Sequence, residues 1–308
     1  MLKKLKVVLG SKLAQLLISG LLVYVAFRKV DVVKLLGEVH QAPWWAVVAI
    51  LVYMGFSMLI GGIRWSILVL GKAKLRDVLA FTRATYAGCF YSLFFPTSVA
   101  GDFLKWTSLL KQYPEISKLK LAGTAIVDRV IGFSAFSMAA LIALIAGKIL
   151  KYSFPGILLW LFLGINAGLV VFYALVFYID FEKILSKYSF LKRILEVVDL
   201  LKNSNKKRIL ICYLISLLSE PIWMMMTWFS SLIFGAGINL MQVLIFMPII
   251  SLILVLPISW AGFGARENLF LVFFGQLGFS TEKLLLVSTF TGIMGILNSL
   301  LGGLMLLF

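Results

Sequence analysis

A long apolar run at residues 241–278 is interrupted by the sequence LPISWAGFG (256–264). A proline inside a helix removes a backbone hydrogen-bond donor and clashes with the preceding turn, and glycines loosen the backbone that follows. We therefore predict that the run consists of two shorter helices joined by a break. The simplest arrangement for such a pair is a re-entrant hairpin, which enters and leaves the membrane on one side.

A second interruption has the same character. The sequence FPTSVAGD (95–102) divides an earlier apolar run, and both interruptions contain Pro-x-Ser-x-Ala-Gly, about 160 residues apart. Each follows an apolar helix of about 16 residues and precedes charged residues, which are Asp102 and Lys105 in one case and Arg266 and Glu267 in the other. We predict a re-entrant hairpin at each place. The alternative is that both breaks are packing kinks.

The composition places the chain in a membrane. Of its 308 residues, 62% are hydrophobic and 14% are charged, whereas a soluble domain carries roughly twice that charged fraction. Apolar runs near the length that crosses a hydrocarbon core of ~30 Å recur along the sequence. We predict an all-α polytopic membrane protein with about six transmembrane helices and two re-entrant broken-helix hairpins. The six predicted spans are 13–27, 44–70, 121–147, 155–178, 209–235 and 284–307.

The basic residues indicate a topology. The net charge is +16, but Lys and Arg lie mainly between apolar runs, which favours topology determination and contact with anionic lipid over nucleic-acid binding. If the N-terminus is cytosolic, the inside loops carry 19 Lys or Arg and the outside loops carry 6. The inside loops are 1–12, 71–77, 105–120 and 179–208, and the outside loops are 28–42, 148–154, 236–240 and 279–283. We therefore predict a multi-pass protein of the cytoplasmic membrane with its N-terminus in the cytosol.

The most basic loop, 179–208, has a pattern of its own. Its eight Lys and Arg residues alternate with apolar residues at a spacing that is typical of an amphipathic helix lying on the cytosolic leaflet. Docking to anionic lipid explains this pattern. Electrostatic recruitment of a lipid substrate is the alternative.

The two halves of the sequence contain the same series of elements, namely two spans, a hairpin and a span. Each half therefore crosses the membrane three times. Because three is an odd number, the second half, about 151–308, is inverted relative to the first, about 1–150. Inverted repeats whose broken helices meet near the midplane recur among transporters, and their substrate sites lie at the breaks. We predict a single transmembrane domain over residues 1–308, arranged as an inverted repeat, with its site between the hairpins.

Charged and small residues at membrane depth are the candidates for substrate binding. Charges there are costly and usually face protein or a water-filled cavity. Arginine binds phosphate through a planar fork, half-helix N-termini offer free N–H groups, and small residues let a phosphate approach. We expect the arginines to bind phosphate, and the acids to pair with them or to bind a cationic headgroup or protons. The candidates are Arg64, Ser98, Gly101, Asp102, Lys105, Asp128, Arg129, Glu220, Ser259, Gly262, Arg266 and Glu267.

The alternative for several candidates is structural. Arg64 could extend to the cytosolic interface, and Asp128 and Arg129 could pair with other buried charges. We predict no catalytic residue, metal site or cofactor: His40 has no neighbouring cluster of acids or cysteines, and Cys89 and Cys212 lie in apolar runs. The sequence contains no Gly-x-x-x-x-Gly-Lys-Ser/Thr loop for ATP, so a gradient or consumption of the lipid would drive any transport.

Three stretches taken together resemble a known family. They are Phe94-Phe95-Pro96-x-Ser98-x-Ala100-Gly101-Asp102-x-x-Lys105, Asp128-Arg129-x-x-Gly132 and Pro257-x-Ser259-x-Ala261-Gly262-Phe263-Gly264-x-Arg266-Glu267. The chain resembles, over nearly its whole length, the flippase-like integral membrane family that includes the transmembrane region of lysylphosphatidylglycerol synthases. The family pattern tends toward Gly-Gly-Asp with a following arginine, where this chain has Ala100-Gly101-Asp102 and Lys105. Without a cytosolic aminoacyl-transfer domain in the sequence, the resemblance implies lipid translocation and not lysyl-lipid synthesis.

The sequence thus leads to a hypothesis of a lipid flippase-like transporter. The headgroup of an anionic or aminoacylated lipid, or of a polyprenyl-phosphate carrier, would enter a hydrated cavity between the hairpins while its tails stay in lipid. Two other classes stay open. A membrane glycosyl- or acyltransferase would need acids or a histidine on a sizeable outside loop, and a non-transporting scaffold could share the fold.

Overall fold

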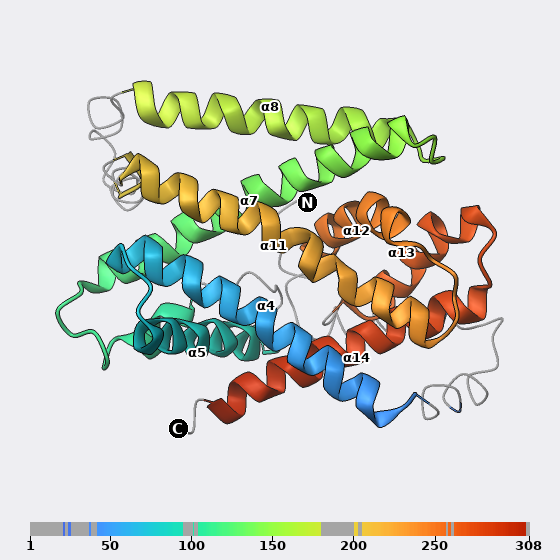
Figure 1. Ribbon diagram of the computed structural model, residues 1–308, viewed down its shortest axis with the longest axis horizontal. Coiled ribbons are helices and arrows are strands. Elements are labelled where there is room, and N and C mark those ends of the chain that lie inside the picture. The colour runs from blue at the N-terminus through green and yellow to red at the C-terminus, as the bar shows by residue number, and fades with distance from the viewer. Residues whose placement is uncertain are drawn as a thin grey trace, which may run out of the picture. The chain divides into compact units, whose positions relative to one another are not determined.

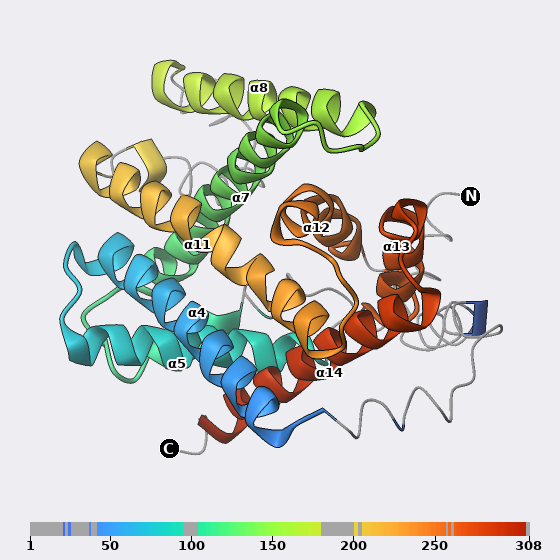
Figure 2. The ribbon, with the colours of Figure 1, turned by 45° about the vertical axis from the view of Figure 1, so that its right-hand side comes forward.

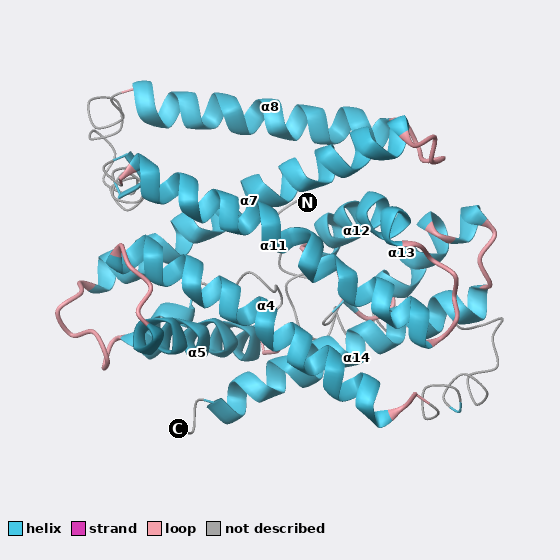
Figure 3. Cartoon of the chain, viewed as in Figure 1, coloured by secondary structure: helices cyan, strands magenta, loops and turns pink. Residues whose placement is uncertain are grey.

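The computed structural model describes residues 42–94, 101, 104–179, 200–202, 205–256, 258–259 and 262–305, together with positions 21, 24, 25 and 37. These residues are mostly helical and contain no β-strand (Figure 3), so the predicted all-α class is confirmed. Several predicted features lie outside the described residues. These are the span 13–27, most of the loop 179–208, and the break residues Pro96, Ser98, Ala100, Asp102, Pro257 and Ala261.

Five described helices are long and apolar enough to cross a membrane, and they correspond to five of the six predicted spans. Their ends depend on caps and turns more than on apolarity. In α7, for example, the Ser117 side chain accepts a hydrogen bond from the Lys120 N–H, so the helix begins before its apolar run. The five helices are α4 (Trp44–Leu70), α7 (Lys118–Ile149), α8 (Ile157–Tyr178), α11 (Lys206–Ile233) and α14 (Thr281–Met305) (Figure 1).

The two interrupted runs form shorter elements. In the first run, α5 (Leu75–Ser92) is followed by the 3-10 helix η1 (Lys105–Leu109). In the second, α12 (Leu240–Leu254) is followed by α13 (Ala265–Phe273) and the 3-10 turn η4 (Gly275–Leu277). Residues 105–109 of the first run form a 3-10 helix, whereas α13 of the second run is an α-helix of nine residues. The re-entrant course of these elements and the inverted relation of the two halves remain predictions.

The chain divides into two compact units. Unit 1 comprises residues 1–57, 86–102 and 222–308, and unit 2 comprises residues 58–85 and 103–221. Each unit takes segments from both halves of the sequence, and α4, α5 and α11 each contribute to both units. Each unit is described by itself below.

Unit 2 is built on α7, with α8 packed beside it (Figures 1 and 2). Its apolar core includes Trp65 and Phe81, whose rings meet edge to face at 5.0 Å. The amide of Asn166 in α8 donates hydrogen bonds to the carbonyl and hydroxyl oxygens of Ser137 in α7, at 3.1 and 2.9 Å. This buried polar contact joins α8 to α7.

A second polar contact in unit 2 lies in the loop after η1. The Tyr113 hydroxyl donates to a carboxylate oxygen of Asp77 at 2.8 Å. Burial, followed by the hydrogen bond and charge of Asp77, raises the pKa of Tyr113 above its ordinary value. The phenol therefore stays neutral and ties the loop to the first turn of α5.

Unit 1 contains α12, α13 and α14, and α13 packs against both of the others (Figure 2). The fully buried ring of Phe274 meets that of Phe246 at 5.5 Å. Gly302 of α14 lies against the backbone of α5, where an added Cβ would collide with the Tyr86 carbonyl oxygen. Small residues thus bring α14 and α5 to backbone contact in this unit.

Candidate functional site

A carboxylate bridged by two cations lies at the centre of unit 2. Asp128 accepts a hydrogen bond from Arg64 Nε on Oδ1 at 2.7 Å and one from Lys105 Nζ on Oδ2 at 3.0 Å. The side chains of Asp128, Lys105 and Arg64 are 3%, 4% and 15% exposed. Asp128 lies ten residues after the start of α7, about 15 Å along its axis. The ion pairs are therefore well inside a membrane-spanning helix.

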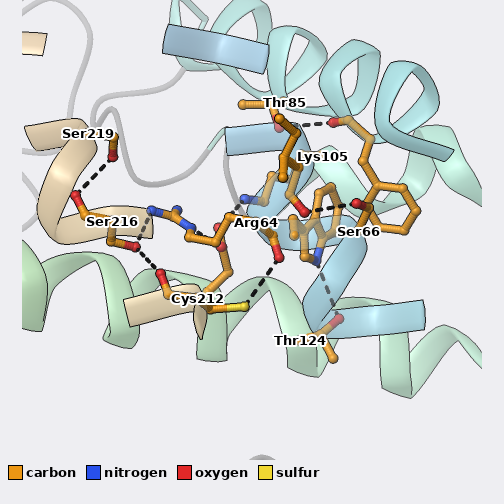
Figure 4. A network of polar contacts seen from close by, with 12 residues as sticks. Arg64, Ser66, Thr85, Lys105, Thr124, Cys212, Ser216 and Ser219 are labelled. Carbon is orange, nitrogen blue, oxygen red and sulfur yellow. Dashed lines mark hydrogen bonds and ion pairs between the residues drawn. The ribbon is translucent and has the colours of Figure 1, made fainter. Parts of the chain in front are cut away.

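Arg64 extends from this carboxylate to α11. Its Nη1 donates to the Ser216 hydroxyl at 2.8 Å, and the Cys212 thiol donates to the Arg64 carbonyl oxygen at 3.5 Å (Figure 4). Gly132, one turn beyond Asp128 on α7, faces the guanidinium, and a Cβ there would lie 3.5 Å from its terminal nitrogens. The Asp128-Arg129-x-x-Gly132 motif thus supplies both the counter-ion of Arg64 and the surface on which the guanidinium lies.

Lys105 is held from two sides. Its ammonium bonds to Asp128 and lies 4.5 Å from the ring centroid of Trp65, a cation–π distance. Trp65 is fully buried, and its indole N–H donates to the Thr124 hydroxyl at 3.4 Å. Lys105 was counted with the inside loop 105–120, but its side chain is buried in an ion pair. Excluding it leaves 18 basic residues inside against 6 outside, so the charge bias is unchanged.

Two further charged side chains belong to the surroundings of this network. Glu220, four residues after Ser216 on α11, interacts electrostatically with Arg64 and Arg129. Arg129 follows Asp128 on α7, and its side chain is exposed. The five described side chains Arg64, Lys105, Asp128, Arg129 and Glu220 comprise three cations and two acids when all are ionised. With all five ionised, the cluster carries one positive charge in excess, which favours an anionic ligand.

The cluster is closed by apolar packing toward the ends of its helices. Between Arg64 and the end of α4 lie Leu68 and Val69, which belong to the same buried core as Leu121 near the start of α7 and Leu201 before α11. The ends of the helices at this side carry the basic loops of the predicted cytosolic face. Along these helices, buried aliphatic side chains therefore lie between the ion pairs and those loops.

The second break forms a separate arrangement within unit 1. Gly262 and Gly264 have φ angles of +80° and +78°, which only glycine adopts without strain. The Gly264 N–H donates to Glu267 Oε2 at 2.6 Å, so the carboxylate caps the first turn of α13. One N–H at the start of α13, that of the N-cap Gly264, is thus bonded by a residue of the helix itself.

Arg266 lies in a groove that glycines leave open. A Cβ on Gly292 of α14 would collide with its guanidinium, and a Cβ on Gly262 would lie 3.1 Å from Nη2. Arg266 also interacts electrostatically with the neighbouring Glu267. Ser259, before the glycines, is buried. The predicted residues Ser259, Gly262, Arg266 and Glu267 therefore belong to one local structure around the start of α13.

The first break is described only in part. Gly101 is buried against α5, where a Cβ would collide with the Gly88 carbonyl oxygen and the Ser92 hydroxyl. Its small size therefore serves close packing here. Ser98 and Asp102, the other two candidates of this break, lie outside the described residues.

The sequence did not identify every residue of the unit 2 cluster. Ser216 and Trp65 were missed, and each contacts a predicted residue. A signal for Ser216 was present, because Cys212, Ser216 and Glu220 recur every four residues and so share one face of α11. Trp65 gave no signal, since tryptophan in an apolar helix is usual at a core position.

Comparison with protein families gives a match over nearly the whole chain. The family of the lysylphosphatidylglycerol synthase transmembrane region matches residues 12–302. The chain belongs to this family. Comparisons with curated proteins and with solved structures gave no significant match.

Membership of the lysylphosphatidylglycerol synthase transmembrane family fits the rest of the structure. It accounts for the multi-pass apolar helices, and it relates the protein to the modification or transport of membrane lipids. All three stretches on which the resemblance was based lie within the matched residues. The described parts of two of them surround Asp128 and Arg266.

Proposed function

We propose that the protein carries the headgroup of an anionic, aminoacylated or polyprenyl-phosphate lipid across the cytoplasmic membrane, without chemical change to the lipid. The observation that supports this most directly is the excess positive charge of the cluster around Asp128. The cation in excess is the exposed Arg129, and a charge on a transmembrane helix is costly unless it faces a ligand, protein or water.

The arrangement of the cluster suggests how a headgroup binds. Arg129, the exposed cation, meets the phosphate first. Arg64 adds a planar guanidinium whose Nη1 donates to a neutral hydroxyl, that of Ser216, which a phosphate oxygen can replace. Asp128 keeps Lys105 and Arg64 in position throughout. The lipid tails remain in the bilayer while the headgroup passes along the polar side chains of the cluster.

Sidedness follows from the charge bias of the loops. The N-terminus and the loops that precede α5, α7 and α11 lie in the cytosol, so Leu68 and Leu121 lie on the cytosolic side of the cluster along their helices. A lipid gradient or an ion gradient supplies the driving force.

The proposal is tested by lipid transfer in vesicles. Purified protein is incorporated into vesicles containing a fluorescent phosphatidylglycerol, and dithionite quenching measures its transfer between leaflets. We expect transfer well above empty vesicles, and a rate at least tenfold lower in Arg129→Gln, since a charged hydrogen bond contributes about 1.5–3 kcal/mol. Arg83→Gln is the matched control, because Arg83 is also an exposed helical arginine but lies on α5 outside the cluster.

Two results would contradict transport. One is wild-type transfer no faster than in empty vesicles for phosphatidylglycerol, an aminoacylated lipid and a polyprenyl phosphate. The other is equal loss of transfer in Arg129→Gln and Arg83→Gln. Mass spectrometry of the recovered lipids provides the check for a transferase, because transport leaves every lipid mass unchanged.

A further inference from the structure

One face of α11 carries an acid. Cys212, Ser216 and Glu220 follow one another at four-residue intervals, and the first two contact Arg64. Glu220 lies one turn beyond Ser216, and its carboxyl interacts with the charges of Arg64 and Arg129. The acid thus lies beside the two arginines to which we assign the headgroup.

Glu220 differs from Asp128 in how its charge is compensated. Each oxygen of Asp128 accepts a hydrogen bond from a different cation, which fixes that carboxylate in the ionised form. Arg64 already makes its closest ionic contact with Asp128, at 2.7 Å. Glu220 therefore shares Arg64 with a stronger competitor and otherwise depends on Arg129, which is exposed.

The charged groups that face Glu220 come from two other helices. Arg64 comes from α4 and Arg129 from α7, while Asp128 and then Lys105 lie beyond Arg64. With Glu220 ionised these five side chains carry one net positive charge, and with Glu220 neutral they carry two. A phosphate bound to Arg64 and Arg129 takes both counter-ions of Glu220 and places a negative charge beside it. Such a neighbour disfavours the ionised carboxylate.

We propose that Glu220 takes up a proton when an anionic headgroup binds, so that lipid and proton are transported together. This inference rests on the proposed function and identifies the coupling ion of the same site. A headgroup with one negative charge and one proton cross as a neutral pair, so the membrane potential does no work on the step. By linkage, an acidic medium must strengthen lipid binding to the same extent that lipid binding promotes proton uptake.

Binding measurements test the coupling without relying on transport. The full chain in nanodiscs of phosphatidylcholine is titrated with dihexanoyl-phosphatidylglycerol, whose phosphodiester keeps one charge between pH 6 and pH 8. We expect wild-type affinity to be about fivefold or more weaker at pH 8 than at pH 6, the lower range of typical coupling. In Glu220→Gln the affinity should be equal at both pH values. Glu282→Gln, which neutralises an exposed acid in the first turn of α14, should behave as wild type.

A second measurement needs no variant. Addition of the same short-chain lipid to wild-type protein in weak buffer near pH 7 should raise the pH of the medium as the protein takes up protons. Wild-type affinity that does not change with pH, pH dependence that persists in Glu220→Gln, or no proton uptake would each overturn the coupling. A rate of lipid transfer in vesicles that does not change with an imposed pH gradient would also overturn the proton coupling, while leaving the transport function intact. If no lipid is transferred at all, the proposed function fails, and the binding titration still decides whether Glu220 binds a proton.

Discussion

The role of the Asp128 carboxylate follows from the two cations that it binds, Arg64 and Lys105. One acid shared by Arg64 and Lys105 keeps two cations inside a membrane helix, and the Trp65 ring covers one of them. The structural alternative raised from the sequence is therefore partly correct, since Asp128 does pair with other buried charges. The pairing and a role in binding are compatible, because the same contacts hold Arg64 at the site.

Removal of the shared acid should be more costly than removal of one cation. Asp128→Asn leaves Arg64 and Lys105 buried with no counter-charge between them, and breaking a buried ion pair in this way costs about 3–5 kcal/mol. Lys105→Met leaves the Arg64–Asp128 pair intact and should cost less. The apparent melting temperature of each variant in detergent measures the difference. An equal or larger loss in Lys105→Met would show that the ion pairs are not the main support of this cluster.

At the scale of elements, glycines decide how closely helices approach. Gly302 is the position in unit 1 where α14 meets the backbone of α5, and a backbone carbonyl cannot move aside as a side chain can. At Gly292 the neighbouring group is the flexible guanidinium of Arg266. The same Gly→Ala substitution should therefore have different effects at these two positions.

Gly302→Ala should destabilise the protein by about 1–3 kcal/mol, the usual cost of overpacking, because the new methyl group collides with the Tyr86 carbonyl oxygen. Gly295→Ala on the same helix is the control. Nothing lies within 4 Å of its Cβ position, and alanine favours helix more than glycine does. Thermal unfolding in detergent should show a lower melting temperature for Gly302→Ala and no loss for Gly295→Ala. Equal melting temperatures would exclude a close α5–α14 contact.

At the scale of the whole molecule, the charge bias predicts which loops face the cytosol. In a chain with Cys89 and Cys212 replaced by alanine, Lys72→Cys and Lys207→Cys should react with an impermeant maleimide only after the cells are opened. Lys148→Cys, at the other end of α7, should react in intact cells. These results follow from the excess of Lys and Arg on one side. Labelling of Lys207→Cys in intact cells would show that the orientation is the reverse of the predicted one.

The bounds of helices could be predicted from the sequence more accurately than the contacts between side chains. The bounds of α4 were predicted to the residue because its apolar run ends at Gly71-Lys72 and begins after Pro43. The pairing of Arg64 with Asp128 could not be predicted, since 64 residues separate them and several acids were equally plausible partners. The Glu267 cap was also missed, although Gly264 and Glu267 have the spacing of an N-cap and its third helical residue.

The cap at α13 has a consequence for selectivity. Glu267 is covalently tethered to the helix whose N-cap N–H it binds, so it competes with any anion that approaches this N–H at a local concentration of about millimolar or higher. Dilute small anions such as chloride or free phosphate must displace this resident carboxylate and gain little by doing so. An anion anchored in the bilayer by its acyl chains is concentrated in the same layer as α13 and competes on more equal terms. We therefore expect this cap to favour membrane-anchored anions over dissolved salts at the start of α13.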